Sequence, residues 1–177
     1  MKFVGIDPSL TSTGLIVLND KGLIEIQRLI KTKPDKEIED RLSYLSSEIL
    51  RILSAMQYDS FLQNAARFQA GSVPIIHIEG LSFGARGQGI MQLAGLHFIL
   101  RTQMKANGFS YKVIAPTELK KYVTGKGNAQ KQVMLMKTLK RWNVEFESDD
   151  LCDAFGLAKM AYETHTIFTP ESQPQSL

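Results

Sequence analysis

Residues 1–30 consist of three short apolar runs separated by turn-forming residues, a pattern that only a few folds can accommodate. The runs are Lys2–Ile6, Leu15–Leu18 and Leu23–Ile30. A turn-rich stretch, Asp7–Gly14, separates the first two, and the hairpin signal Asn19–Gly22 separates the last two. Short apolar runs joined in this way predict a three-stranded antiparallel meander.

The rest of the chain alternates between helical and strand patterns. Apolar residues recur at helical spacing from Lys36 towards Ala70, and two further apolar runs predict strands. The predicted strands are Val73–Ile78 and Tyr111–Ile114, and the later predicted helices are Ile90–Asn107, Pro116–Val123, a helix capped by Asn128 and ending at Trp142, and Asp149–Glu163. We therefore expect an α/β fold whose mixed five-stranded sheet, the antiparallel meander plus parallel strands, is flanked by helices. We expect one domain over residues 1–163 and a disordered tail over residues 164–177.

Cysteine content, hydropathy and charge limit the classes of protein. The single cysteine excludes an internal disulfide, no secretion signal is recognisable, and no apolar run reaches the roughly 20 residues that span a bilayer. We expect a soluble cytoplasmic protein without a membrane partner. Ten basic residues and one acid lie between Arg101 and Arg141, whereas seven acids and one base follow from Trp142 onwards. This asymmetry suits a protein that binds a polyanion with the help of cations, although solvated helix faces would also explain it.

Four acidic residues occupy positions that predict a metal site. Asp7 and Glu79 follow apolar strands, while Asp150 and Asp153 share one face of a helix start. If these elements meet, the four carboxylates demand compensating cations, and oxygen ligands favour Mg²⁺ or Mn²⁺ over zinc. Two such ions would suit phosphodiester hydrolysis. Individually, Asp7 could instead begin a turn, and Asp150 could simply be a helix N-terminal charge.

Basic and loop residues complete the candidate site. Four lysines in or beside the later helices could contact DNA phosphates: Lys120, Lys121, Lys126 and Lys131. Phe83 and Arg86 lie in the glycine-rich segment Gly80–Gly89, where Phe83 could open stacked bases or fold back onto the core. The glycines of this segment match no phosphate-binding loop, so no nucleotide cofactor is expected.

Several segments of the chain resemble those of RuvC-type Holliday junction resolvases. They are Gly5–Ser9 with Thr13-Gly14, Ile78-Glu79, Glu118–Lys131 and Asp150–Ala154. The resemblance implies a ribonuclease-H-like fold, a homodimer, divalent metal and paired nicks in a four-way DNA junction. It also implies that Asp7, Glu79, Asp150 and Asp153 are metal ligands and that Lys120 and Lys131 contact phosphate, with Lys131 in the catalytic set. The glycine-rich loop and an insertion-like stretch around residues 58–70 look more similar to phage or prophage relatives.

The sequence leaves two alternative functions open and favours one oligomeric state. The stretch from Asp7 to Gly14 also resembles the phosphate-gripping hairpin of actin-like or sugar-kinase-like phosphotransferases, but the chain is short for their two domains. A non-catalytic junction-binding protein is the second alternative. The helix Ile90–Asn107 has apolar residues on more than one side, which independently favours a homodimer.

Overall fold

The computed structural model describes residues 1–65, 73–82 and 87–168. Its centre is one five-stranded sheet with the order β3-β2-β1-β4-β5. Strand β2 is antiparallel to β1 and β3, while β4 is parallel to β1 and β5 is parallel to β4. The predicted mixed sheet is therefore confirmed. The strands are β1 (Phe3–Asp7), β2 (Ser12–Leu18), β3 (Ile24–Lys31), β4 (Ile75–Glu79) and β5 (Tyr111–Ile114).

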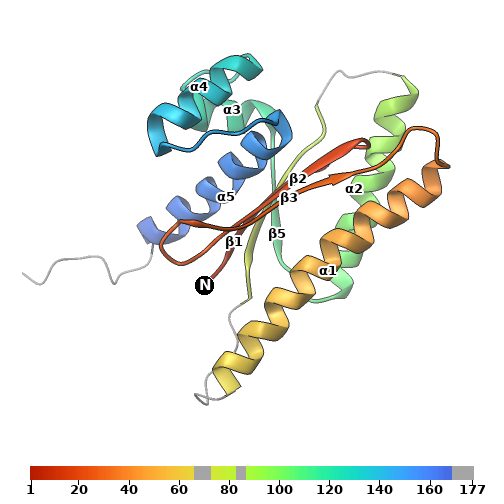
Figure 1. Ribbon diagram of the computed structural model, residues 1–177, viewed down its shortest axis with the longest axis horizontal. Helices are drawn as coiled ribbons and strands as arrows, with labels where there is room; N and C mark the ends of the chain where they lie inside the picture. The colour runs from red at the N-terminus through yellow and green to blue at the C-terminus, as the bar shows by residue number, and fades with distance from the viewer. Residues whose placement is uncertain (66–72, 83–86, 169–177) are drawn as a thin grey trace, which may run out of the picture.

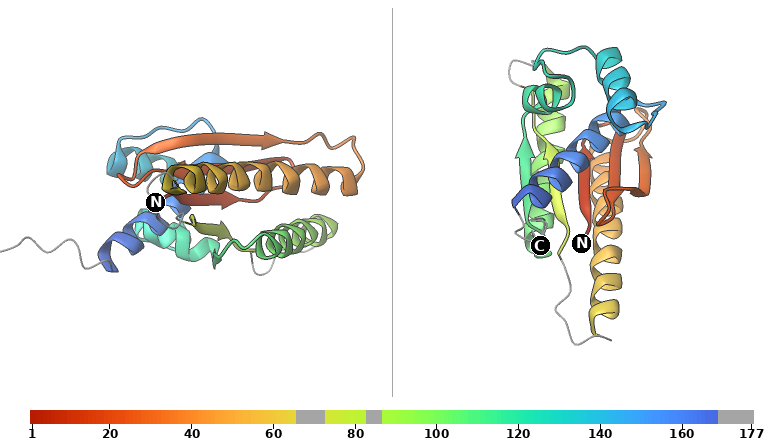
Figure 2. Two further views of the ribbon diagram at one scale, coloured as in Figure 1. Left: turned by 90° about the horizontal axis from the view of Figure 1, so that it is seen from below. Right: turned by 90° about the vertical axis from the view of Figure 1, so that its left-hand side faces the viewer.

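The helices form two layers around this sheet. Helix α5 crosses one face, with α3 and α4 packed against it, and α1 and α2 lie on the opposite face (Figures 1 and 2). The helices are α1 (Ile38–Ala65), α2 (Gln88–Ala106), α3 (Pro116–Thr124), α4 (Lys131–Trp142) and α5 (Asp149–Phe168). Within the described residues, none of them is both long enough and apolar enough to cross a membrane.

Strand β1 supplies side chains to both layers because successive residues of a strand point to opposite faces. Val4 and Ile6 belong to the core beneath α1 and α2, whereas Phe3 belongs to the core beneath α5. Gly5 and Asp7 follow the alternation of Phe3 and therefore face α5. The strand thus places its terminal carboxylate on the side that α5 covers.

Two glycines allow the backbone of α5 to lie directly on the sheet. A Cβ atom added at Gly5 would stand 1.9 Å from the carbonyl oxygen of Ala154, and one added at Gly14 would stand 2.1 Å from that of Asp150. No side chain fits in either gap. Because Gly5 and Gly14 have no Cβ, the first turns of α5 can lie close to β1 and β2. This close packing also determines the position of the acids that these turns carry.

The structure corrects three of the predicted boundaries. Strand β4 begins at Ile75 and not at Val73. Helix α4 has Gln130 as its N-cap, because residues 126–129 form a turn in which Ala129 donates to the carbonyl oxygen of Lys126, so the cap predicted at Asn128 is wrong.

Helix α5 continues to Phe168, so the first residues of the predicted tail, from Thr164, are helical. Its later turns still contact the sheet, since the ring of Phe3 lies 5.2 Å from that of Tyr162 and 5.6 Å from that of His165. Residues 169–177 lie outside the described residues.

Candidate active site

Three carboxylates from three elements meet at one edge of the sheet. Ile6 of β1 pairs with Ile78 of β4, so the residues that follow them, Asp7 and Glu79, stand side by side. Asp153 joins them from α5. One carboxylate oxygen from each of the three lies within 4.8 Å of the others. The structure therefore brings together acids that are far apart in the sequence.

Burial and mutual repulsion disfavour the charged forms of these three groups. Burial raises the pKa of Asp7 well above its ordinary value, and the neighbouring Glu79 raises it further. Burial also raises the pKa of Glu79. For Asp153, burial and then Glu79 raise the pKa to about 7, while the charge of Lys120 acts against the shift. Holding the charged forms of these carboxylates together is electrostatically unfavourable, and a bound cation would remove this repulsion.

The three acids fit a hard divalent cation. Carboxylate oxygens are the ligands that Mg²⁺ and Mn²⁺ prefer, and no cysteine or histidine belongs to this group within the part of the chain that the structure describes. The cluster also opens on a cavity of about 240 Å³, which gives a substrate access to it.

Asp150, the fourth predicted ligand, lies close to the cluster but is not one of its three members. Its charge helps to raise the pKa values of Asp7 and Glu79, so it belongs to the same electrostatic environment. It lines a neighbouring groove together with Ser12, Lys31 and Lys131. Its position one helical turn before Asp153 places it beside β2, where the α5 backbone contacts Gly14.

Two of the four predicted DNA-binding lysines lie at the cavity. Lys120 of α3 and Lys131 of α4 both line it, together with Glu79 and Asp153. Lys131 is exposed and forms an ion pair of 3.0 Å with Asp149, a residue that the sequence analysis did not place in the site. Lys121 and Lys126 are exposed and do not line the cavity. Phe83 and Arg86 lie outside the described residues.

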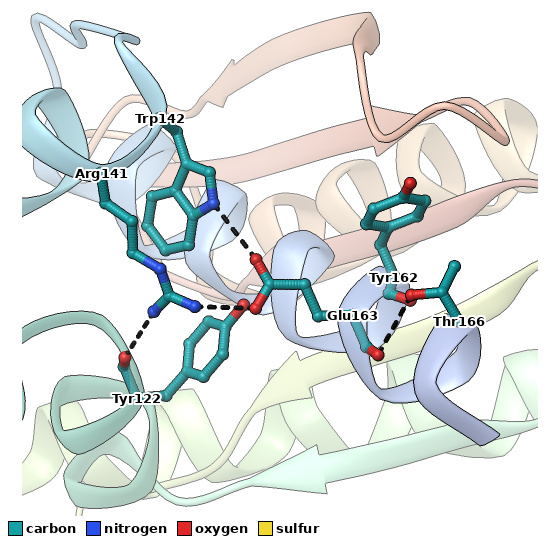
Figure 3. A network of polar contacts seen from close by, with 6 residues as sticks. All are labelled: Tyr122, Arg141, Trp142, Tyr162, Glu163 and Thr166. Atoms are coloured by element: carbon teal, nitrogen blue, oxygen red, sulfur yellow. Dashed lines mark hydrogen bonds and ion pairs between the residues drawn. The ribbon is translucent and has the colours of Figure 1, made fainter. Parts of the chain in front are cut away.

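An aromatic and ionic network holds the two lysine-bearing helices on α5 (Figure 3). Arg141 of α4 donates to the backbone oxygen of Tyr122 in α3 at 2.9 Å and to Glu163 of α5 at 2.7 Å. Its guanidinium stacks 4.7 Å from the ring of Tyr122 and 4.3 Å from that of Trp142, whose indole N–H also donates to Glu163. The network ties the position of Lys120 and Lys131 to the helix that carries Asp153.

His97 of α2 also lies at this site, although the sequence pattern did not predict it there. Its imidazole is buried and lines the same cavity as Glu79 and Asp153. The sequence does show a polar residue within the apolar stretch that forms α2. The helical pattern alone, however, does not indicate which neighbour such a residue faces.

The raised pKa of Asp153 predicts that the metal-free protein loses stability as the pH rises. The carboxyl has an ordinary pKa of 3.8 and a folded pKa of about 7, so the folded state retains its proton in this interval while the unfolded state releases it. The associated stability is present below the ordinary value and is lost as the pH rises through about 7. We expect Asp153→Asn to increase the free energy of unfolding in EDTA at pH 8 by on the order of 2–4 kcal/mol.

Urea unfolding of both proteins at pH 5 and pH 8 tests this expectation. The difference in the free energy of unfolding between the variant and the wild type should be smaller at pH 5, because the wild-type carboxyl keeps its proton in the folded state at that pH. An equal difference at both pH values would show that packing, and not charge, is responsible.

Comparison with known proteins identifies the family. The sequence model of the family described as crossover junction endodeoxyribonuclease RuvC matches residues 3–160. The chain belongs to the RuvC family. Among RuvC proteins, that of Rickettsia felis is 28% identical over 172 residues, covering 94% of this chain and 99% of the relative. That of Sulfurovum sp. is 29% identical over 166 residues, covering 89% and 92% respectively.

Solved RuvC structures share the fold. Thermus thermophilus RuvC matches with a TM-score of 0.68 at 18% identity, and the same protein in complex with a Holliday junction substrate matches with a TM-score of 0.70 at 16% identity. Each match covers 94% of this chain and 96% of the other. These findings confirm the ribonuclease-H-like fold and the RuvC resemblance, and they favour the nuclease over the phosphotransferase.

Proposed function

We propose that this chain is a metal-dependent endodeoxyribonuclease that resolves four-way DNA junctions by paired nicks, with Asp7, Glu79 and Asp153 holding its metal. The meeting of these three carboxylates beside Lys120 and Lys131, on the fold of a junction-resolving family, carries the proposal. Asp150, next to the cluster, would supply the fourth ligand, and the ions would be two Mg²⁺, with Mn²⁺ as a substitute. No nucleotide cofactor would be needed. The phage-like origin stays a prediction.

The residues of the site divide the chemistry between them. A divalent metal supplies Lewis-acid activation of water and charge stabilisation at the phosphate when it is bound. Asp7, Glu79 and Asp153 fix the place of the cation at the end of β1 and β4. Lys120 and Lys131 hold the scissile phosphate against that place, because they are the lysines that line the cavity. The lysines attract the DNA, and the cation that the acids hold would determine which phosphate is cut.

Incubation with a labelled four-way junction and Mg²⁺ tests the proposal. We expect symmetric nicks in strands of like polarity, and no cutting in EDTA. Matched linear duplex, flap and fork substrates show how strictly the enzyme selects junctions. A purified, folded chain that binds junctions but leaves them intact with Mg²⁺ and with Mn²⁺ would favour the non-catalytic alternative.

Replacing Lys120 by alanine should slow junction cutting by at least about tenfold, because this lysine lines the cavity and its charge acts to lower the pKa of both Glu79 and Asp153. Lys137→Ala is the matched control, since Lys137 is exposed on α4 and does not line the cavity. Single-turnover rates on one junction measure both effects. Similar losses in the two variants would indicate a general effect of charge.

We also propose that the enzyme is a homodimer formed through α2. Met91 and Phe98 are 76% and 64% exposed, and a spacing of seven residues puts them on one face of the helix. Two exposed apolar side chains on one face are costly in water, and a second copy would cover them. Paired nicks also need two active sites, one from each copy.

Replacing Phe98 by glutamate should convert the dimer to a monomer, because a charge would then enter the apolar interface. Sedimentation velocity at micromolar concentration measures the change. Met136→Glu is the control, since Met136 is an exposed apolar residue on α4, across the sheet from α2. A wild-type chain that sediments as a monomer would refute the proposal.

A further inference from the structure

His97 is a buried polar residue in a cavity that the proposed mechanism uses only in part. The residue is 4% exposed, and its helix α2 packs on the face of the sheet opposite α5. It lines the cavity with Leu93, which lies one helical turn earlier, and the same cavity reaches Glu79 and Asp153. A polar group in this place has direct access to whatever enters beside the acids.

The imidazole of His97 is a buried titratable group that lines the cavity. Burial, followed by the charge of Arg101, lowers its pKa to about 4, so the ring is neutral at physiological pH. A neutral imidazole offers one N–H donor and one nitrogen acceptor.

His97 does not belong to the metal cluster. The ring is absent from the group of acidic side chains whose oxygens approach one another. The imidazole therefore lines the cavity without joining the carboxylate cluster and can contact a part of the substrate other than the scissile phosphate.

The walls of the cavity suit a nucleobase. Apolar groups from four elements or loops line it: Pro8, Leu93, Pro116 and Met134. Its volume of about 240 Å³ far exceeds the roughly 10–15 Å³ that a single water needs. An unstacked base presents apolar faces and an edge with donors and acceptors, and proteins bind such bases between apolar side chains and neutral polar groups. A phosphate would instead favour the positive end of the cavity, at Lys120 and Lys131.

We propose that His97 is a specificity-determining residue that hydrogen-bonds the edge of a base unstacked next to the scissile phosphate. The inference rests on the proposed nuclease function and deepens it. With the phosphate held at the acids and lysines, the adjoining base enters the apolar part of the cavity and meets the imidazole. A base whose edge complements the ring is bound, and another leaves the imidazole unpaired, so the enzyme cuts preferentially at certain sequences.

Cleavage of a set of four-way junctions tests the inference. The set carries each of the four bases, in turn, at every position that flanks the crossover, and the rates of cutting are compared. We expect the wild-type enzyme to prefer one or two bases at one position. In His97→Leu the ratio of the fastest to the slowest rate should fall by at least about fivefold, because a specific base contact is worth that much or more.

Three further variants separate base recognition from a structural role. His97→Asn keeps one donor and one acceptor group and should restore part of the preference. Leu100→Met, a volume-conserving change in the core one turn along α2, should leave the preference unaltered. His97→Met repeats the test with a side chain of different shape in case leucine does not fold. His97→Leu should unfold at the same or a higher urea concentration than the wild type, since it replaces a buried polar side chain by an apolar one.

The possible results distinguish this inference from the proposed function. A wild-type chain that cuts no branched DNA would refute the proposed function and the inference together. A wild-type chain that cuts junctions without base preference would refute the inference alone. A folded His97→Leu or His97→Met enzyme that keeps the wild-type preference would do the same.

Discussion

Asp7→Asn is expected to slow junction cutting by at least about 100-fold while junction binding is retained. Asp7 is 8% exposed and forms the carboxylate cluster with Glu79 and Asp153, so its carboxylate belongs to the proposed metal site. Asparagine has nearly the same shape but no negative charge, which removes one ligand without disturbing the core. The lysines that attract DNA are unchanged, because they belong to α3 and α4.

Single-turnover cutting in Mg²⁺ and binding of the same junction in EDTA measure the two parts of this prediction. Glu79→Gln should behave as Asp7→Asn does, since the two side chains are adjacent. Asp20→Asn is the control, because Asp20 is an exposed acid in the turn between β2 and β3. Loss of binding in parallel with cutting would mean that Asp7 serves the fold or the DNA contact and not the metal.

Gly5→Ala is expected to destabilise the protein by about 3 kcal/mol or more and to abolish cutting. The added methyl group would stand 1.9 Å from the carbonyl oxygen of Ala154 and 2.6 Å from the backbone nitrogen of Ala158. Backbone atoms of a helix cannot turn aside as a side-chain end can, so all of α5 must move away from β1. Overpacking a core typically costs 1–3 kcal/mol, and a clash with backbone belongs to the upper end of this range or beyond.

Urea unfolding monitored by circular dichroism measures the effect. Gly89→Ala is the matched control, because no atom of the described residues lies within 4 Å of a Cβ at this helical position, and alanine there should be neutral or stabilising. The fraction that stays folded should also cut slowly, since displacement of α5 carries Asp153 away from Asp7. A Gly5→Ala protein as stable and as active as the wild type would show that α5 can move without cost.

Much of the architecture follows from local patterns in the sequence. The apolar runs and turns of the first thirty or so residues predicted the meander, and β5 was predicted at its observed bounds, Tyr111–Ile114. Asp7 and Glu79 could be selected because each follows an apolar strand, and for Glu79 neither propensity nor solubility favours that position. Boundaries such as the start of α4 and the end of α5 were predicted less well, because packing extends or shortens a helix beyond its local signals.

The sequence by itself determined the order of strands and helices and the acids that end β1 and β4, because hydrophobic periodicity and turn chemistry act between near neighbours in the chain. Only the tertiary structure decided which other groups join them. The depth at which α5 sits on Gly5 and Gly14 brings Asp153 into the cluster and leaves Asp150 beside it. The packing of α3 and α4 on α5 selects Lys120 and Lys131, and the rotation of α2 directs His97 into the cavity. These outcomes depend on contacts between segments far apart in the chain, and no local pattern encodes them.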